Sequence, residues 1–254
     1  EGAGLENVET EWFFTREDTG KMSYAQQAHF DLDGALESIR EAVRLDPENA
    51  LAWARLSELW LSVGDLDQSL HAAQRAADIH PDLARTQSVL GFACLTQIKL
   101  EESRNAFMRA IALDTADPQP RLGLGLTDIR EGKLEEGRRH IEISAALDPN
   151  NALVRSYMGK AYYEEKRDRL ARREYAAAKE LDPKDPTPWL YDAIMKHAEN
   201  RPVEAMQDLE TSMELNDNRA VYRSQLMLDQ DLAARSAGLA RIYSDLGFEQ
   251  RALV

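Results

Sequence analysis

The sequence predicts an all-α fold, a right-handed α-solenoid in which pairs of helices stack one after another. Three observations indicate this architecture: a period of about 34 residues, small side chains at fixed places within that period, and apolar spacings of three to four residues between them. The two-residue alternation that is typical of strands extends over no more than a few residues. A chain of 254 residues, 43% of them hydrophobic, is long enough for such an array.

The period is clearest in a short motif near the end of each unit. Its copies are Leu-Asp-Pro at 45–47, 147–149 and 181–183, and the related Ile79-His80-Pro81, Leu113-Asp114-Thr115 and Leu215-Asn216-Asp217. The motif keeps its phase throughout, so residues 16–219 form six units of equal length.

Small residues recur at three positions of each unit. The eighth position holds Ser23, Ser57, Gly91, Gly125, Gly159 and Ala193. The twentieth holds Ala35, Ser69, Ser103, Gly137, Ala171 and Ala205, and the twenty-seventh holds Ala42, Ala76, Ala110, Ser144, Ala178 and Ser212. Two helices approach closely only where side chains are small, so these positions mark the helix crossings. Bulkier residues at the twenty-fourth and thirtieth positions, such as Phe107 and Leu113, are expected to fill the space between them.

Turn and capping residues predict where each helix ends. Gly64 and Gly132 lie near the middle of their units, where the first helix, helix A, must stop and the chain must reverse. Polar residues that follow the closing motif, at Asn49, Asp82 and Asn151, offer a cap to helix A of the next unit. Each unit is therefore predicted to be a helix pair.

This pattern resembles the tetratricopeptide repeat family. The second unit matches the family consensus at Trp53, Leu56, Trp60, Gly64, Ala76 and Pro81. The fifth unit, Ala152 to Asp185, matches it at Met158, Gly159, Tyr162, Ala171, Tyr175, Ala178 and Pro183. The resemblance covers about four-fifths of the chain. It implies stacked helix pairs and a role in protein–protein interaction, but arrays of this kind serve many pathways.

A second resemblance concerns segments that differ from the generic repeat. The segments that differ from the generic repeat are Asn216 to Ser224, Asp231 to Ala237 and Arg241 to Tyr243, and Ser23 to Ala28 and Glu199 to Ala205 share their resemblance. They are similar to large bacterial envelope proteins in which an iron-dicitrate-regulator-like domain precedes the repeats and a predicted outer-membrane β-barrel region follows them. The resemblance implies a periplasmic or outer-membrane-associated setting, and a cytoplasmic location is the alternative.

Both ends of the chain depart from the period. Residues 1–21 include Thr19-Gly20, a poor start for a helix, and Trp12-Phe13-Phe14, which has no counterpart elsewhere; we expect a leader, a tag or a capping extension here. The first unit is accordingly expected to be incomplete in helix A. Residues 220–232 are expected to form an irregular insertion, and 233–254 a truncated seventh unit. Since a truncated array exposes an apolar flank, we expect more repeat or another domain to follow.

The sixth unit is degenerate. Asp192 occupies its seventh position, which is apolar in most of the other units. Lys196 follows four residues later, so the two side chains can pair on one helix face.

The charge of the chain excludes some classes of partner. Forty-five acidic and 31 basic residues give a net charge of −14. Nucleic acid and anionic membrane surfaces would be repelled on average, because both are recognised through clustered Lys and Arg. The sequence has no run of 18 apolar residues, so it predicts no membrane insertion of this chain. The predicted partner is a protein or peptide segment, and the oligomeric state is left open.

The sequence gives little support for catalysis. The five histidines, at 29, 71, 80, 140 and 197, include no pair spaced three to five residues apart, as two metal ligands on one helix would be. Cys94 takes a position inside helix A where a buried structural thiol is the expected role. We therefore predict a protein that is not an enzyme, with no metal and no cofactor.

Inward-facing positions of the stacked A helices predict a binding groove. Positions 2, 5, 9, 12 and 13 of each unit, with neighbouring tyrosines, point toward the concave face. The candidate groove residues are Tyr24, Phe92, Leu95, Leu122, Leu126, Ile129, Tyr157, Tyr163, Leu190, Tyr191 and Ile194. An apolar groove of this kind would bind an extended or helical segment. The alternative is that several of these residues pack between neighbouring units.

The predicted function is thus a non-catalytic interaction scaffold, within a larger bacterial envelope protein according to the second resemblance. A cytoplasmic peptide-binding adaptor and a regulatory repeat array of a larger enzyme are the alternatives.

Overall fold

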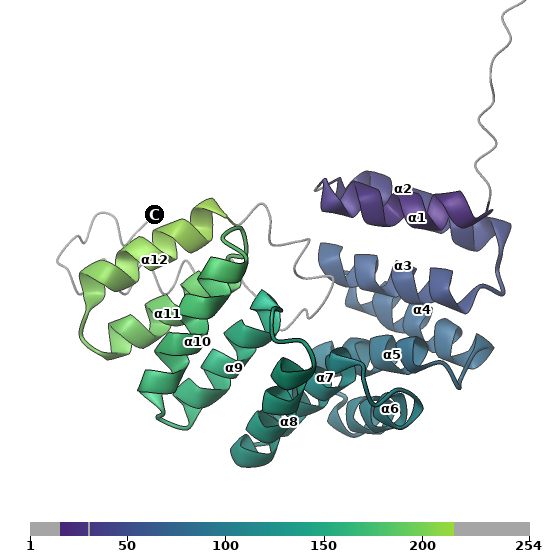
Figure 1. The fold of residues 1–254 in the computed structure, drawn as a ribbon. Helices are drawn as coiled ribbons and strands as arrows, with labels where there is room; N and C mark the ends of the chain where they lie inside the picture. The colour runs from purple at the N-terminus through teal and green to yellow at the C-terminus, as the bar shows by residue number, and fades with distance from the viewer. Residues whose placement is uncertain (1–15, 30, 216–254) are drawn as a thin grey trace, which may run out of the picture.

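The computed structural model describes residues 16–29 and 31–215, which form twelve α-helices and no strands (Figure 1). The helices are α1 (Arg16–Ala28), α2 (Leu32–Leu45), α3 (Ala50–Val63), α4 (Leu66–Ile79), α5 (Ala84–Thr96), α6 (Leu100–Leu113), α7 (Pro118–Arg130), α8 (Leu134–Leu147), α9 (Ala152–Glu164), α10 (Asp168–Leu181), α11 (Thr187–Ala198) and α12 (Pro202–Glu214). Odd-numbered helices are the A helices of the six units, and even-numbered helices are the B helices.

The helix pairs form the predicted all-α solenoid. The first five A helices begin one period apart, and α11 begins one residue later than the period requires. Each A helix packs closely against the B helix of its own unit, and each B helix packs against the A helix that follows. The pairs trace a curved path in Figure 1, with α1 and α2 at one end, α7 and α8 at the bend, and α11 and α12 at the other end.

The first unit extends further than the sequence indicated. Helix α1 begins at Arg16, so residues 16–21 are helical and belong to the array rather than to a leader. Packing of α1 against α2 explains this difference, because tertiary contacts can outweigh the low helix propensity of Thr19 and Gly20. The rest of the predicted leader or extension, residues 1–15, the predicted insertion 220–232 and the predicted seventh unit 233–254 lie outside the described residues.

The predicted small-residue positions are the helix crossings. The Ser57 hydroxyl donates to the Ser69 carbonyl at 2.8 Å, which joins the eighth and twentieth positions of the second unit. In the fourth unit, a Cβ added to Gly125 would lie 2.6 Å from the carbonyl oxygen of Gly137. A larger side chain could not fit there without moving the backbone, so these crossings require small residues.

The A helices of the second to sixth units end in the same left-handed turn. Gly64 and Gly132 have φ of 88° and 87°, as expected for glycines that stop a helix. Ile98, Lys166 and Asn200 occupy the same position in their units and have φ near 60° without being glycine. The turn geometry is therefore repeated even where the sequence does not signal it.

The predicted caps are confirmed in two of three cases. The side chains of Asn49 and Asn151 accept hydrogen bonds from the backbone N–H groups of Ala52 and Val154, each at 3.1 Å. Asp82 does not cap helix α5, whose N-cap residue is Leu83. Its carboxylate instead pairs with Arg109 at 2.9 Å, one unit further on.

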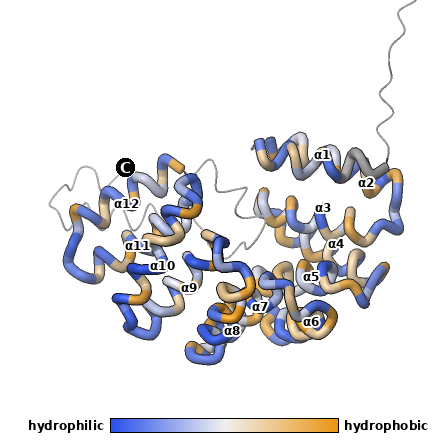
Figure 2. Tube along the Cα trace, in the orientation of Figure 1, coloured by the Kyte–Doolittle hydropathy of each residue, from blue (hydrophilic) through white to orange (hydrophobic). Residues whose placement is uncertain are grey.

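The core runs between the helices along the array. Residues at the twenty-fourth position are buried in all six units, from Ile39 to Leu209. The thirtieth position is different, because its leucines are about 40–45% exposed at Leu45, Leu113, Leu147 and Leu181. These leucines lie in the last turn of their B helices, where fewer neighbours cover them. Apolar and polar residues are interspersed along the helices in Figure 2, because each helix packs against its neighbours with some of its faces and meets solvent with the others.

Ion pairs link neighbouring units at a constant separation of 27 residues. The same contact recurs at Arg104–Glu131, Arg138–Glu165 and Arg172–Glu199, with distances of 2.6, 2.9 and 2.5 Å. A second series joins Glu48 to Arg75 and Asp82 to Arg109. Since each partner sits one period after the previous one, the series ties successive units together in the same geometry.

The predicted pair in the sixth unit is part of a larger polar cluster. Lys196 lies 3.0 Å from Asp192, and both also contact residues of neighbouring helices. Lys179 contacts Asp192 at 2.6 Å and Asp208 at 3.0 Å, while Lys196 contacts Asp208 at 2.5 Å. Two lysines and two aspartates thus join α10, α11 and α12, and Asp192 stands where the other units have Met or Leu.

None of the described helices is both long and apolar enough to cross a membrane.

Candidate functional site

The candidate site lies on the face formed by the A helices. Helices α3 and α5, α5 and α7, and α9 and α11 pack against one another, whereas α1 and α3, and α7 and α9, approach less closely. A cleft lies beside each of these two wider places, and we name them the first cleft and the second cleft.

The first cleft has a volume of about 440 Å³ and is lined by residues from the first four units. They are Tyr24, Gln27, Ala28, Arg55, Glu58, Leu61, Arg85, Ser88, Val89, Phe92, Gln119 and Asn151. Side chains from four successive units can meet around one cavity only on the inside of the curve. The first cleft is therefore on the concave face of the solenoid.

Arg55 forms the inner wall of the first cleft. Its guanidinium donates to the Ser23 hydroxyl and to the Ser23 carbonyl, each at 3.2 Å, and to the side chain of Gln27. It also stacks over the ring of Tyr24, 3.9 Å from the centroid. These contacts join α3 to α1 across the wider gap, so Arg55 fixes the position of the first unit.

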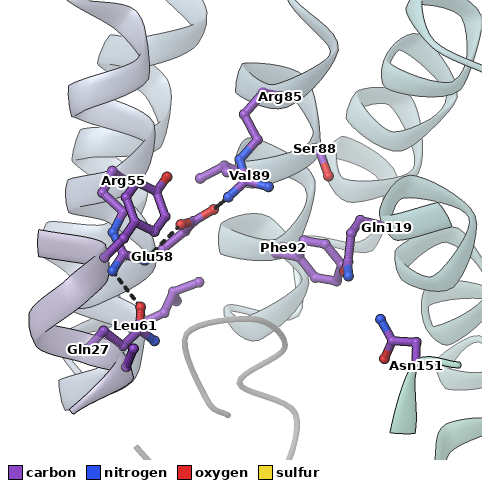
Figure 3. Close-up of a pocket in the computed structure, with 12 residues that line it drawn as sticks. Gln27, Arg55, Glu58, Leu61, Arg85, Ser88, Val89, Phe92, Gln119 and Asn151 are labelled. Atoms are coloured by element: carbon purple, nitrogen blue, oxygen red, sulfur yellow. Dashed lines mark hydrogen bonds and ion pairs between the residues drawn. The ribbon is translucent and has the colours of Figure 1, made fainter. Parts of the chain in front are cut away.

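Glu58 connects two arginines. It pairs with Arg55 at 3.3 Å and with Arg85 on the next A helix, as the row of side chains in Figure 3 shows. The carboxylate of Glu58 raises the pKa of Arg85, and burial is the main cause that raises the pKa of Tyr24. Because arginine side chains stay protonated in proteins, Arg55, Glu58 and Arg85 together carry one excess positive charge.

Side chains on the opposite wall of the first cleft make fewer internal polar contacts. Phe92 and Gln119 face the arginine row in Figure 3. The Gln119 side-chain amide has no hydrogen-bond partner among the described residues, whereas Asn151 is occupied by capping α9. A free amide beside an aromatic ring is suited to contact a polypeptide backbone.

The second cleft has a volume of about 370 Å³ and lies between the fourth, fifth and sixth units. It is lined by Leu126, Ile129, Arg130, Leu134, Tyr157, Lys160, Glu164 and Tyr191. The rings of Tyr157 and Tyr191 meet edge to face, with centroids 5.9 Å apart. At the edge of the cleft, Lys160 lies 3.2 Å from Glu164 and 5.8 Å from the centre of the Tyr191 ring.

The structure brings six of the eleven predicted groove residues into these clefts. Tyr24 and Phe92 line the first cleft, and Leu126, Ile129, Tyr157 and Tyr191 line the second. Ile194 is exposed but lines neither cleft. Leu190 packs against the small core of the sixth unit, and Tyr163 is half-buried against the main core.

Two further predicted groove residues line neither cleft, because they are fully buried in the core. Leu95 and Leu122 are both 0% exposed and belong to the main hydrophobic cluster. Their helices pack directly against each other, since α5 contacts α7, and this contact covers the inward-facing leucines. The predicted groove is thus interrupted by packing between the third and fourth units. Four of the residues that do line the clefts, Phe92, Leu126, Tyr157 and Tyr191, are themselves only 3–8% exposed and belong to the same hydrophobic cluster as Leu95.

The structure adds charged residues that the apolar pattern does not contain. Arg85, Lys160 and Arg130 occupy positions 2, 9 and 13 of their units, which are inward-facing positions. Their positions alone would identify them as cleft residues. Arg55 is at position 6, and only its contacts with the preceding unit reveal its role.

Among the described residues, neither the free thiol nor a metal-binding cluster is found in the lining of the clefts. Cys94 is buried, and burial raises the pKa of its thiol to about 11. No three His, Cys, Asp or Glu side chains among the described residues are grouped so that they could hold a metal ion. The chemistry available in the clefts is hydrogen bonding, ion pairing and aromatic contact.

Several solved structures share this fold. The chain is similar to the Cut9–Hcn1 hetero-tetramer of the APC/C, with a TM-score of 0.72 and 17% identity over 87% of this chain and 41% of that chain. It is similar to a tetratricopeptide repeat protein from Parabacteroides merdae, with a TM-score of 0.66 and 12% identity over 85% and 86% of the two chains. A thermophilic tetratricopeptide repeat protein of Thermus thermophilus gives a TM-score of 0.64 and 19% identity over 71% and 98%. At these identities the likeness shows the fold alone.

The sequence comparison is more specific. No curated protein matches the chain. The tetratricopeptide repeat profile matches residues 22–84 and 122–186, which together make up half of the chain. These matches and the twelve described helices show that the chain belongs to the tetratricopeptide repeat family.

Proposed function

We propose that this chain is a non-catalytic scaffold that binds a polypeptide segment along its concave face. Tetratricopeptide folds are in general protein-interaction scaffolds, and their stacked helices present an extended concave surface. The observation that carries the proposal is the convergence of side chains from four units on the first cleft. The second cleft continues the same kind of lining in the later units.

The lining of the clefts supports a polypeptide as the ligand. Each cleft combines aromatic and aliphatic side chains with a few charged groups. Such surfaces take up the side chains of an extended or helical segment and hydrogen-bond its backbone. The side-chain amide of Gln119, which has no hydrogen-bond partner in the described part of the chain, supplies one of these contacts.

Site-specific photo-crosslinking tests this proposal. A photoreactive phenylalanine analogue is placed at Tyr24 or Ile194, which are exposed on A helices, or at Met108 or Ile143, which are comparably exposed on B helices. In cells that express the native protein, we expect a partner polypeptide to be captured from Tyr24 and Ile194 and not from the two control positions. Equal capture from all four positions, or capture from the B helices alone, would contradict binding on the concave face.

We further propose that the native protein functions in the bacterial envelope, on the periplasmic side. The support is the likeness of the segments around Ser23 to Ala28 and Glu199 to Ala205 to envelope proteins. Fractionation of cells that express the native gene tests this placement. Recovery of the protein with the cytoplasmic fraction would instead favour an adaptor in that compartment.

A further inference from the structure

The charge of the two clefts is opposite to the charge of the chain. The whole sequence carries a net charge of −14. The residues that line the clefts, however, include four basic side chains, Arg55, Arg85, Arg130 and Lys160, and only two acidic ones, Glu58 and Glu164. Because basic side chains outnumber acidic ones in the clefts of a protein that is acidic overall, the clefts favour a negatively charged ligand.

The basic groups differ in how far they are committed to internal contacts. Arg55 is 4% exposed and uses its guanidinium to hold α1 against α3, so it mainly supplies a fixed positive charge. Arg85 is 42% exposed while it pairs with Glu58. Arg130 is exposed and has no charged partner among the described residues. Arg85 and Arg130 can therefore each donate hydrogen bonds to a carboxylate of the ligand, one at each cleft.

Small exposed parts of apolar side chains reach the clefts beside these arginines, since Phe92 is 6% exposed, Leu126 is 8% exposed and Ile129 is partly buried. Phe92 and Val89 lie in the first cleft with Arg85, and Ile129 and Leu126 lie in the second with Arg130. A ligand that satisfies both features carries carboxylates next to aromatic or aliphatic side chains. A basic segment would place its charges against arginines and would be disfavoured.

We propose that the concave face binds an acidic segment of a partner protein, in which Asp or Glu residues alternate with aromatic or aliphatic ones. This inference rests on the proposed function and specifies the chemistry of its ligand. The acidic residues pair with Arg85 at the first cleft and with Arg130 at the second. The apolar residues between them occupy the spaces beside Phe92 and Ile129.

Selection from a displayed library of random dodecapeptides tests the inference while the partner is still unidentified. The full chain is the target, and enriched peptides are synthesised and measured by fluorescence anisotropy. Three variants follow: Tyr24→Ala alters the first cleft, Arg130→Glu reverses a charge in the second, and Arg169→Glu is the control. Arg169 is an exposed arginine on α10 that lines neither cleft and has no charged partner among the described residues. Circular dichroism checks that each variant is folded.

We expect the enriched peptides to be net acidic and to bind roughly three- to tenfold more weakly to the Arg130→Glu variant, as for reversal of an exposed ion pair. Binding to the Arg169→Glu variant should be unchanged. Peptides that depend on Tyr24 or Arg130 but are neutral or basic would overturn the acidic ligand and leave the scaffold function standing. If no enriched peptide is weakened by Tyr24→Ala or Arg130→Glu, both the inference and the proposed concave-face function fail.

Discussion

Ile98 occupies the place of Gly64 one repeat later and adopts the same left-handed conformation, with φ of 61° against 88°. A β-branched residue is strained in this region by about 1–2 kcal/mol, because its Cβ crowds the following carbonyl. The side chain of Ile98 is 61% exposed, so little packing offsets the strain. We expect Ile98→Gly to raise the free energy of unfolding by roughly 0.5–1 kcal/mol, measured by urea denaturation.

The reverse substitution at the matching site is the control. A Cβ at Gly64 would meet nothing within 4 Å, so Gly64→Ala changes only the backbone preference. This variant should lose about 1 kcal/mol of stability. A loss of stability in Ile98→Gly would show that the exposed side chain makes contacts that outweigh the strain.

These turns also show what the sequence can and cannot predict about the fold. The helix pairs are predictable because a crossing such as Ser57 with Ser69 requires small residues, which recur visibly in the sequence. The left-handed turns at Ile98 and Lys166 are not visible, because the stacking of the units imposes a geometry that the local residues disfavour. Tertiary packing likewise extends α1 back to Arg16.

A second prediction concerns the interior of the third and fourth units. The ring of Phe107 fills the space beside two glycines, and a Cβ at Gly123 would lie 2.1 Å from its Cζ atom. Phe107 is 0% exposed and cannot move aside without displacing its neighbours. We expect Gly123→Ala to cost about 1–3 kcal/mol of unfolding free energy in urea denaturation.

Replacing Phe107 by a smaller residue tests whether its ring causes the cost of Gly123→Ala. Combining Gly123→Ala with Phe107→Leu should cost less than the sum of the two single substitutions, because the added methyl group then occupies vacated space. Strict additivity of the two costs would mean that Gly123 is needed for another reason.

A third prediction compares two tyrosines of the fifth unit. The hydroxyl of Tyr175 is buried without a hydrogen-bond partner among the described residues, whereas that of Tyr162 donates to Glu142 at 2.9 Å. Burying an unpaired hydroxyl is unfavourable, so Tyr175→Phe should leave stability unchanged or raise it by up to about 1 kcal/mol. Tyr162→Phe should lower it by about 1 kcal/mol. Thermal unfolding of both variants would decide, and a clear loss in Tyr175→Phe would indicate an unrecognised partner.

The sequence predicts where the candidate site lies, but not which inward-facing side chains stay uncovered or that Arg55 takes part. Inward-facing positions identify Tyr24 and Ile129 correctly as cleft residues. The same rule fails at Leu95, because the distance between neighbouring A helices decides whether an inward side chain is covered, and a single unit does not encode that distance. The inward-position rule does not identify Arg55 for a related reason, because Arg55 donates a hydrogen bond to Ser23 of the preceding unit, 32 residues away.

A fourth prediction concerns the polar cluster of α10, α11 and α12 and its response to pH. Burial alone would raise the pKa of Asp192, but hydrogen bonds and charge from Lys179 and Lys196 outweigh it and lower that pKa. A carboxyl group whose pKa is lower in the folded state contributes stability above its unfolded pKa of about 4. That contribution is lost as the pH falls through the folded pKa.

Substitution of Asp192 by asparagine should therefore cost stability at neutral pH and much less in acid. We expect Asp192→Asn to lower the free energy of unfolding by roughly 2 kcal/mol at pH 7, because both lysines lose one of their two carboxylate partners. The difference from the unsubstituted protein should shrink below pH 4. Glu135→Gln, which removes one partner of an exposed pair with Arg139, is the control and should cost less than about 0.5 kcal/mol. A cost for Asp192→Asn that stays the same from pH 7 to pH 3 in urea denaturation would mean that Asp192 stabilises α11 through packing rather than through its charge.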